Sequence, residues 1–403
     1  MVNVAILGFG TVGSGVAEVL TKNGGLIDQR VDDLVRLKYI LDVRDFPDSP
    51  FADCFVKDFS IIEQDPEVDI VVETIGGATI ALEFTTRALK AGKSVVTSNK
   101  ELVATHGYDL LQLARENGVS YLFEASVGGG IPILRPLCQC LAANEISSVC
   151  GILNGTTNYI LTEMVQMGKS FDLALREAQQ KGYAEADPTA DVEGIDAGRK
   201  ICILADLCFG KNVPPSSITM EGITKITPAD IECARALGYK IKLLGRAMRT
   251  GPNSVTAFVA PHLISRSAPL ANVDGVMNGI SVRGDAVGEA MFFGPGAGSL
   301  PTASAVAADI IDCVRDPKTR TYTGWWPSEP GYVTAPDKIS CRWMVRTNSP
   351  LADIAAAFSG VRFINAPNAA PDEYAFVTGY MSGEELKAKT AGMSVLAKYR
   401  VLD

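Results

Sequence analysis

Residues 2–13 read VNVAILGFGTVG, and this stretch decides the fold of the first part of the chain. Its first six residues are mostly apolar and β-branched, which predicts a buried strand, and apolar residues recur at helical spacing up to Leu20. Glycines stand between the two as G-x-G-x-x-G, where they allow a tight turn, close approach of a pyrophosphate and close helix packing. The stretch therefore predicts a dinucleotide-binding Rossmann unit. Its expected cofactor-binding residues are Gly8, Phe9, Gly10, Thr11, Val12 and Gly13.

Strand and helix patterns alternate after this motif. Strands are predicted at 37–43, 70–72, 94–97 and 120–123, and helices at 79–91 and 101–116. Such alternation is typical of right-handed βαβ units, which build a parallel sheet. We therefore expect an α/β protein whose Rossmann domain covers residues 1–131.

The pattern changes after about residue 130. Helical patterns at 157–167 and 188–209 precede strand patterns at 240–248 and 254–259, which predicts an α+β substrate-binding and dimerisation domain over 132–299. A glycine-rich loop at 294–301 leads into an apolar helix at 302–314. We expect residues 300–316 to rejoin the Rossmann domain.

The end of the chain predicts one more unit. Residues 317–337 are rich in proline and lack periodicity, and are interpreted as a linker. Residues 339–346 then alternate as a half-buried strand. With a helix at 351–358, strands at 361–364 and 374–380, a further helix and a final strand, they predict a small βαββαβ domain over 338–403.

Composition excludes several classes of partner. The 403 residues carry a net charge of −9, which argues against binding to nucleic acid or to an anionic membrane. Nine cysteines without a C-x-x-C pair are typical of reduced thiols. The N-terminus does not resemble a signal peptide, and the apolar runs are shorter than a membrane span. We therefore expect a cytoplasmic protein.

The end of the second predicted strand bears on the choice of cofactor. An acidic residue there favours NAD because it binds the ribose hydroxyls, whereas an arginine favours the extra phosphate of NADP. Both types are present, as Asp42 and Arg44, and Lys57 follows. The sequence therefore leaves the preference between NAD and NADP open.

A nicotinamide dehydrogenase needs a group that exchanges a proton with the substrate oxygen. Histidine is the usual choice, but the chain has only His106 and His262, and neither has patterned acidic neighbours. His262 is predicted to lie in a turn. The alternative is a lysine whose pKa is lowered by burial or by a neighbouring cation.

Residues 182–200 supply such a lysine. Asp187 precedes a proline and predicts a helix N-cap, and Asp196 and Lys200 then share one face of the helix. Two further carboxylates, Glu185 and Asp191, lie in or near the first turn. By spacing alone, the cluster is either a binding site for a substrate ammonium group or an ordinary solvent-exposed helix N-terminus with charged side chains.

At this point the sequence resembles the homoserine dehydrogenases. The matching stretches are VVETIGG at 71–77, TSNK at 97–100, EASVGGGI at 124–131, LNGTTNYIL at 153–161, residues 182–200, and GPGAG at 294–298 with Pro301 and Thr302. The resemblance covers about residues 1–320. It implies interconversion of L-homoserine and L-aspartate 4-semialdehyde by hydride transfer with NAD(P) and lysine-assisted proton transfer. That reaction serves threonine, methionine and isoleucine biosynthesis.

The resemblance also implies roles for single residues. Lys200 and Lys100 would act at the reacting oxygen, and Glu185, Asp191 and Asp196 would hold the amino acid in a pocket completed by Thr156 and Tyr183. Arg44, Thr74, Lys100 and Gly296 would lie beside the cofactor. Glu124, with the carbonyl groups of Val127, Gly129 and Ile131, would bind a monovalent cation such as Na⁺. The alternative for this last stretch is a glycine-rich turn where domains meet.

The C-terminal unit resembles the ACT regulatory domain found at this end of many homoserine dehydrogenases. The acidic residue and Pro-Gly that usually follow the first strand of that domain are replaced by residues 348–351, NSPL. Binding of an effector and a purely structural role in packing or oligomerisation therefore both remain open. The expected assembly is a homodimer or homotetramer.

Two rival functions also remain at this stage. Cys150 precedes an NGTTN turn after a predicted strand, which is compatible with a thiol-dependent semialdehyde dehydrogenase. The second rival is a non-enzymatic NAD(P)H sensor, in which the C-terminal unit reports cofactor occupancy.

Overall fold

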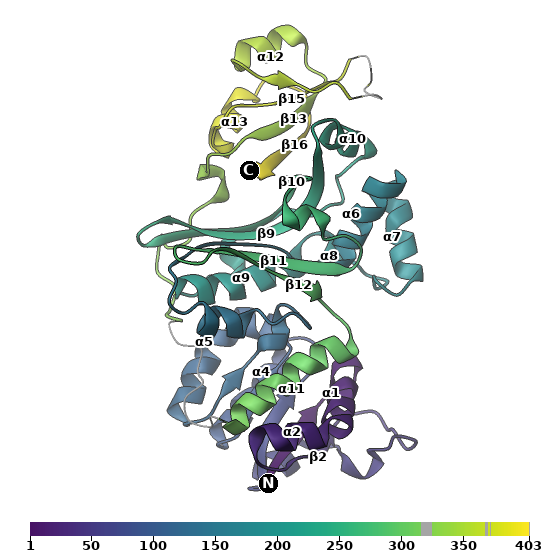
Figure 1. Ribbon diagram of the computed structural model, residues 1–403, viewed down its shortest axis with the longest axis vertical. Coiled ribbons are helices and arrows are strands. Elements are labelled where there is room, and N and C mark those ends of the chain that lie inside the picture. Colours follow the sequence, from purple (N-terminus) through teal and green to yellow (C-terminus); the bar gives the residue numbers. More distant parts are fainter. Residues whose placement is uncertain (316–324, 367–369, 371, 403) are drawn as a thin grey trace.

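The computed structural model describes residues 1–315, 325–366, 370 and 372–402, and its first layer is a parallel sheet (Figure 1). The strand order is β3-β2-β1-β4-β5-β6. The strands are β1 (Val2–Leu7), β2 (Val35–Leu41), β3 (Phe55–Val56), β4 (Val68–Glu73), β5 (Ser94–Thr97) and β6 (Tyr121–Leu122). The helices are α1 (Thr11–Lys22), α2 (Gly24–Val31), α3 (Phe59–Gln64), α4 (Thr79–Lys90) and α5 (Lys100–Glu116). The predicted Rossmann fold is confirmed, with small shifts at the element ends.

The topology of this sheet positions a ligand site. The chain runs outward from β1 in one direction through β2 and in the other through β4, so the strand order reverses between β1 and β4. Leu7 pairs with Leu41 on one side and with Glu73 on the other, which brings three carboxyl ends to one edge. A crevice at such a switch point is where open α/β sheets bind ligands.

Helix α11 (Ser299–Arg315) returns to this layer from far along the chain. It packs on α1 and also reaches β4 and β5, as Figure 1 shows. The Ser299 hydroxyl donates a hydrogen bond of 2.7 Å to the carbonyl of Thr11. A Cβ atom at Gly15 would lie 2.5 Å from that hydroxyl oxygen, so the helices meet where α1 has no side chain.

The second layer is a ten-stranded mixed sheet. Its main path is β12-β11-β7-β9-β10-β16-β13-β15-β14, and β8 pairs with β10. Its strands are β7 (Ile146–Ile152), β8 (Thr219–Met220), β9 (Tyr239–Gly251), β10 (Ser254–Ser265), β11 (Met277–Gly284), β12 (Gly288–Pro295), β13 (Trp343–Thr347), β14 (Arg362–Phe363), β15 (Tyr374–Val377) and β16 (Val395–Leu402). The helices beside it are α6 (Gly155–Met167), α7 (Phe171–Gln180), α8 (Thr189–Val192), α9 (Ile195–Phe209), α10 (Pro228–Ala236), α12 (Leu351–Ala357) and α13 (Gly383–Lys389). Helix α9 lies between this sheet and α5 of the first layer (Figure 1).

Two local predictions were wrong. The helix expected over 188–209 is broken into α8 and α9 at Gly194, which has a φ of +81° that the α-helix does not allow. His262, expected in a turn, lies in β10, where it pairs with Lys242 of β9 and is fully buried. The strand continues through Pro261, which pairs with Leu243 of β9.

The C-terminal residues have the predicted βαββαβ order, with sheet neighbours β16-β13-β15-β14. Strand β16 also pairs in parallel with β10, through His262 to Ile264, so this unit extends the central sheet. Of the expected linker at 317–337, residues 317–324 lie outside the described residues. The rest packs on the molecule: Trp325 is 1% exposed and contacts the ring of Phe123. In the part of the chain that the structure describes, no helix is long and apolar enough to cross a membrane.

Candidate active site

The glycine-rich turn has the geometry that a dinucleotide requires. Gly8 has a φ of +93°, which only glycine adopts readily, and a Cβ atom at Gly13 would lie 1.9 Å from the Gly8 carbonyl oxygen. A Cβ atom at Gly10 would meet no atom within 4 Å, so the turn is open there. No side chain caps α1 at Gly10, which leaves its first amide groups available to an anion. The residues present therefore fit a pyrophosphate.

Neighbouring side chains hold this turn in place. The Thr74 hydroxyl lies 2.9 Å from the carbonyl oxygens of both Leu7 and Gly8, and Asp42 accepts a hydrogen bond of 2.7 Å from the Phe9 amide. Phe9 packs edge-on against the rings of Phe46, Phe51 and Phe55. Thr74 and Phe9 therefore support the turn through their own contacts.

Asp42 and Arg44 form one unit. The guanidinium of Arg44 donates to both carboxylate oxygens of Asp42 at 3.0 Å and stacks over Phe46. The Arg44 side chain is 59% exposed, and Lys57 donates to the carbonyl groups of residues 42–44. Hydrogen bonds from Arg44 are the main reason that the pKa of Asp42 is lowered. Asp42 is thus occupied by protein donors, while Arg44 presents its outer face to solvent.

A cluster of two lysines around one carboxylate spans the two layers. Lys100 begins α5 of the first layer, and its Nζ atom lies 2.6 Å from Oδ1 of Asp196 on α9. Lys200, one turn further along α9, donates a hydrogen bond of 2.8 Å to the other oxygen of Asp196. Lys200 also donates to the carbonyl of Leu153 at 2.8 Å. A second ion pair, Arg199 to Glu101, joins the same two helices at 3.2 Å.

Burial and charge act in opposite directions on this cluster. Burial lowers the pKa of Lys200, the Asp196 charge opposes this shift, and the nearby Lys100 charge adds to it, leaving the pKa of Lys200 below its usual value. Burial raises the pKa of Asp196, but the two lysine charges outweigh that effect and the pKa is lowered. Asp196 is therefore ionised, while Lys200 loses its proton more easily than an exposed lysine.

Asn154 completes the cluster, and the sequence analysis did not single it out. Its side-chain nitrogen donates to Asp191 at 2.7 Å and to Asp196 at 2.8 Å, and its side-chain oxygen caps α6 by accepting from the Thr157 amide. Burial raises the pKa of Asp191, although this hydrogen bond opposes the shift. Its signal in the sequence is an asparagine between a strand and a helix, the position of a helix N-cap.

The other residues expected around the substrate are less closely gathered. Thr156 donates a hydrogen bond of 2.6 Å to the Tyr183 carbonyl, and its hydroxyl also lies near Asp191, where it opposes the rise that burial causes in the pKa of that carboxyl. Tyr183 is 44% exposed and packs edge-on against Tyr159. Glu185 is exposed, and its backbone carbonyl accepts a hydrogen bond from the Gln179 side chain. The structure thus joins Lys100, Asp191, Asp196 and Lys200, with Thr156 beside them.

The stretch expected to bind a cation forms a tight buried turn. The Glu124 carboxylate accepts hydrogen bonds from the amides of Ile133, Leu134 and Arg135 at 2.6–2.8 Å. A Cβ atom at Gly129 would lie 2.3 Å from the carbonyl oxygen of Gly296, so the two glycine-rich loops touch here. The described residues contain no cluster of three or more acidic, histidine or cysteine side chains suited to a metal ion. A site built from carbonyl groups stays a prediction.

The competing nucleophile and bases lie elsewhere. Cys150 faces a cavity on the other side of the central sheet, lined also by Arg246 and Leu270, and burial raises the pKa of its thiol to about 11. Such a thiol is a poor nucleophile near neutral pH. His262 is fully buried, and burial lowers its pKa. A thiol mechanism is therefore disfavoured.

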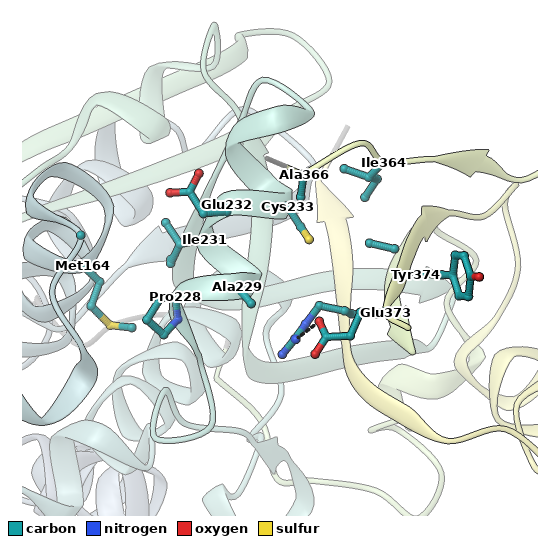
Figure 2. Close-up of a pocket in the computed structure, with 13 residues that line it drawn as sticks. Met164, Pro228, Ala229, Ile231, Glu232, Cys233, Ile364, Ala366, Glu373 and Tyr374 are labelled. Carbon is teal, nitrogen blue, oxygen red and sulfur yellow. Dashed lines mark hydrogen bonds and ion pairs between the residues drawn. The ribbon is translucent and has the colours of Figure 1, made fainter. Parts of the chain in front are cut away.

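A further cavity of about 360 Å³ lies away from the lysine cluster, at the base of the C-terminal unit. Figure 2 shows Pro228 and Cys233 of α10 on one side and Glu373 and Tyr374 on the other. Neither lysine of the cluster lines it.

Comparison with known proteins agrees with this arrangement. A family model described as the homoserine dehydrogenase NAD binding domain matches residues 8–124, and one described as homoserine dehydrogenase matches residues 132–311. The homoserine dehydrogenase of Neisseria gonorrhoeae is 48% identical over 317 residues, which are 78% of this chain and 72% of the relative.

Solved structures are similar over the same regions. The homoserine dehydrogenase from Thiobacillus denitrificans matches 100% of this chain and 98% of its own, with a TM-score of 0.91 and 37% identity. A hyperthermophilic archaeal homoserine dehydrogenase in complex with NADPH matches 79% of this chain and 99% of its own, with a TM-score of 0.67 and 30% identity. Because sequence and fold agree over most of its length, this chain belongs to the homoserine dehydrogenase family.

Proposed function

We propose that the cluster of Lys100, Asp196 and Lys200 is the place where this chain interconverts L-homoserine and L-aspartate 4-semialdehyde with NAD(P). The observation that carries the proposal is the junction itself. Lys100 comes from the layer that has the dinucleotide turn, and Lys200 comes from the layer that the second family model covers. A substrate between the layers would meet both the cofactor and a lysine with a lowered pKa.

The residues divide the work of the reaction. A bound NAD(P) would supply the hydride acceptor for the oxidation of homoserine and the hydride donor for the reverse reaction. Lys200 takes the proton from the substrate hydroxyl, because its lowered pKa makes the neutral amine accessible. The side chain of Lys100, on the other oxygen of Asp196, would stabilise the negative charge that develops on the substrate oxygen. Asp196 holds both lysines and fixes their separation.

The amino-acid part of the substrate needs opposite charges. Asp191, in contact with Asn154 and Thr156, offers a carboxylate to the substrate ammonium group, and Glu185 and Tyr183 lie at the more exposed side of the same segment. Arg44 and Gly296 are proposed to border the cofactor, together with the glycine-rich turn.

A direct assay tests the function. Purified protein would be given homoserine with NAD⁺ or with NADP⁺, and reduction of the cofactor would be followed. Reduction that requires homoserine supports the proposal and reports the cofactor preference. Cofactor binding without any reduction would instead support the sensor.

Three finer features belong to the proposal. Glu124 with the carbonyl groups of Val127, Gly129 and Ile131 suits a hard monovalent cation in its oxygen-only donor set, although the carboxylate already has three amide partners. We also propose a homodimer or homotetramer, which the mass in solution would establish. The C-terminal unit is proposed to be ACT-like, which its βαββαβ order supports.

A further inference from the structure

A buried carboxylate, Glu73, lies at the end of β4 and has no part in the reaction described above. Its side chain is 0% exposed. Its Oε1 atom accepts a hydrogen bond of 2.6 Å from the Ile75 amide, and its Oε2 atom accepts one of 2.6 Å from the Thr97 hydroxyl. Its hydrogen-bond donors are thus uncharged, and no lysine or arginine among the described residues compensates its charge. Moving an isolated charge from water into the protein interior costs free energy, so a buried carboxylate without a cation is unusual.

The hydrogen bonds from Glu73 continue to the N-terminus of α5. Because the Thr97 hydroxyl gives its proton to Glu73, its oxygen is free to accept, and it accepts from the Asn99 amide at 2.9 Å. Asn99 in turn caps α5, since its side-chain oxygen accepts from the Leu102 amide at 3.0 Å. The ionised carboxylate can only accept, so it fixes the direction in which the Thr97 hydroxyl points, while the Asn99 amide can only donate to the Thr97 oxygen.

The same carboxylate also fixes the loop that follows β4. Asn99 donates through its side-chain nitrogen to the carbonyl groups of Ile75 at 3.0 Å and Gly77 at 2.8 Å. Thr74, next to Glu73, contacts the turn at Gly8. Glu73 therefore ties together the loop against the dinucleotide turn and the first turn of α5.

Lys100 is the first residue of that helix. Its position relative to Asp196, 2.6 Å away on the other layer, depends on where α5 begins. We propose that Glu73 is a positioning residue, which holds Lys100 at the reacting oxygen through Thr97 and Asn99. The inference rests on the function proposed above, because it assigns Glu73 a role only if Lys100 acts there.

The charge state of Glu73 supports this role. Burial raises the pKa of Glu73 to about 7, against the opposing hydrogen bonds from Thr97, Ile75 and Asn99. When Glu73 is protonated it can donate to Thr97 instead of accepting, so the contact that fixes the Thr97 hydroxyl can reverse. The titratable group that feels the Glu73 charge is Tyr121, which is itself buried with a raised pKa and is therefore neutral.

Four variants of the full-length chain test the proposal. Glu73→Gln keeps the shape of the side chain but presents an N–H group to Thr97, and Thr97→Val removes the hydroxyl. We expect kcat for homoserine oxidation to fall between about tenfold and a hundredfold in both. The KM for homoserine and the Kd for NADPH, measured by fluorescence, should change by less than about threefold, since misplaced catalytic groups reduce kcat. Thr97→Ser should restore kcat, and Thr85→Val is the control, because Thr85 is equally buried but has no hydrogen-bond partner in the described chain.

The pH profile gives a second readout that a structural role would not move. Wild-type kcat should show an inflection near the Glu73 pKa of about 7, and Glu73→Gln should lack it. Wild-type kcat in both Glu73→Gln and Thr97→Val, or a dependence of kcat on pH that is the same in Glu73→Gln as in the wild type, would overturn the proposal. If Glu73→Gln does not fold, the proposal is tested by comparing kcat between Thr97→Val and Thr97→Ser.

Failure of this inference can be told from failure of the proposed function. An active wild type, an inactive Lys100→Met variant and a fully active Glu73→Gln variant would reject only the role of Glu73. A wild type that does not reduce the cofactor with homoserine would reject the function itself.

Discussion

Asp196 contacts two ammonium groups at once, and this single carboxylate organises the site. One of its oxygens faces Lys100 and the other faces Lys200 and Asn154. Two cations with one buried anion leave excess positive charge, which favours deprotonation of one lysine. Lys200 is the one that is buried, with 10% of its side chain exposed against 40% for Lys100. This difference in burial is the reason that proton transfer is assigned to Lys200 and charge stabilisation to Lys100.

Replacing Lys200 by methionine tests that division. Lys200→Met should lower turnover in both directions by about 10²–10⁴, the usual contribution of a proton-transfer group, while cofactor binding stays unchanged. Steady-state rates in both directions and NADPH fluorescence would measure this. Lys211→Met, which removes a surface ion pair with Glu329, is the control. Near-normal turnover in Lys200→Met would refute the assignment.

The carboxylates of the 182–200 segment should act on substrate binding. Asp191→Asn and Glu185→Gln each remove a negative charge that complements the substrate ammonium group, so the KM for homoserine should rise with a smaller effect on kcat. Asp191 should have the larger effect, because it contacts Asn154 whereas Glu185 is exposed. An unchanged KM in both variants would show that the amino group binds elsewhere.

Glu73 should also make the free energy of unfolding depend on pH. Its pKa of about 7 in the folded protein exceeds the reference value of 4.5, so the folded state holds its proton more tightly. The contribution of Glu73 to folding stability is then greatest below pH 4.5 and falls as pH rises to 7, by a loss on the order of 3 kcal/mol. Glu73→Gln should therefore raise the melting temperature above pH 7 more than at pH 5. Glu63→Gln is the control, and it should lower the melting temperature at neutral pH, because Arg87 lowers the pKa of Glu63. Lower stability of Glu73→Gln at high pH would contradict this account.

At the scale of elements, the break between α8 and α9 sets the direction of α9, the helix that carries Asp196 and Lys200. Gly194 turns the chain with a φ of +81°, and a Cβ atom there would lie 3.1 Å from a methyl group of Val259 on β10. Asp196 and Lys200 follow within the next two turns, so their direction is set by this glycine and by the sheet beneath it. A continuous helix over 188–209 would carry them to a different angle.

Substitution at this glycine should affect both fold and site. Gly194→Ala combines a left-handed conformation with a tight contact, and should cost more than about 1–2 kcal/mol in the free energy of unfolding. It should also lower kcat. Gly168→Ala is the matched control: its φ is +65°, but a Cβ atom there meets nothing within 4 Å. Denaturant unfolding and homoserine oxidation would measure both, and equal losses in the two variants would argue against a special role for the contact.

Local patterns were enough to predict most elements of this fold. The strand and helix around Gly8, and the order of the C-terminal strands, could be read from periodicity because each depends on neighbours in sequence. The break at Gly194 was missed because an isolated glycine in an apolar helical pattern is compatible with a continuous helix. The turn assigned around His262 was wrong because the pairing of β10 with β16, more than a hundred residues later, is invisible to a local window.

The site was predictable to a similar extent. Asp196 and Lys200 follow from helical spacing, whereas the ion pair of Lys100 with Asp196 joins residues almost a hundred positions apart and was expected only by resemblance. Asn154 was overlooked because its side chain serves two carboxylates that lie far from it in sequence. Contacts between layers depend on tertiary packing, which spacing alone does not encode.

At the scale of the whole molecule, the C-terminal unit is built into the central sheet. Strand β16 covers the edge of β10, and buried Arg346 pairs with buried Asp230 of α10 at 2.9 Å and with Glu373 at 2.8 Å. The cavity in Figure 2 lies beside these ion pairs. The unit therefore supports the fold of the substrate-binding layer.

Truncation after Pro336 tests what the unit contributes. We expect weak or absent threonine inhibition in the intact chain, because the loop after β13 has no glycine that would let backbone amides approach a small ligand. The truncated chain should have a lower melting temperature and a changed mass in solution, since the β10 edge becomes exposed. Strong threonine inhibition that vanishes on truncation would show instead that the unit is a working effector site.

A point variant isolates the ion pairs from the rest of the unit. Arg346→Met leaves Asp230 buried without its cation, which should cost about 3–5 kcal/mol. Adding Asp230→Asn should recover part of this loss in the double variant. No recovery would mean that Arg346 acts through packing alone.

The return of α11 to α1 has a consequence for how the protein is made. The face of α1 that bears Gly15 is covered only by a helix that lies nearly three hundred residues later in the chain. At ribosomal rates of about 5–20 residues per second, that face stays open for roughly 15–60 s after it emerges. The nucleotide-binding layer therefore cannot complete its folding on the ribosome before most of the substrate-binding layer has been synthesised. Chaperones that bind nascent apolar helices have their longest opportunity at α1.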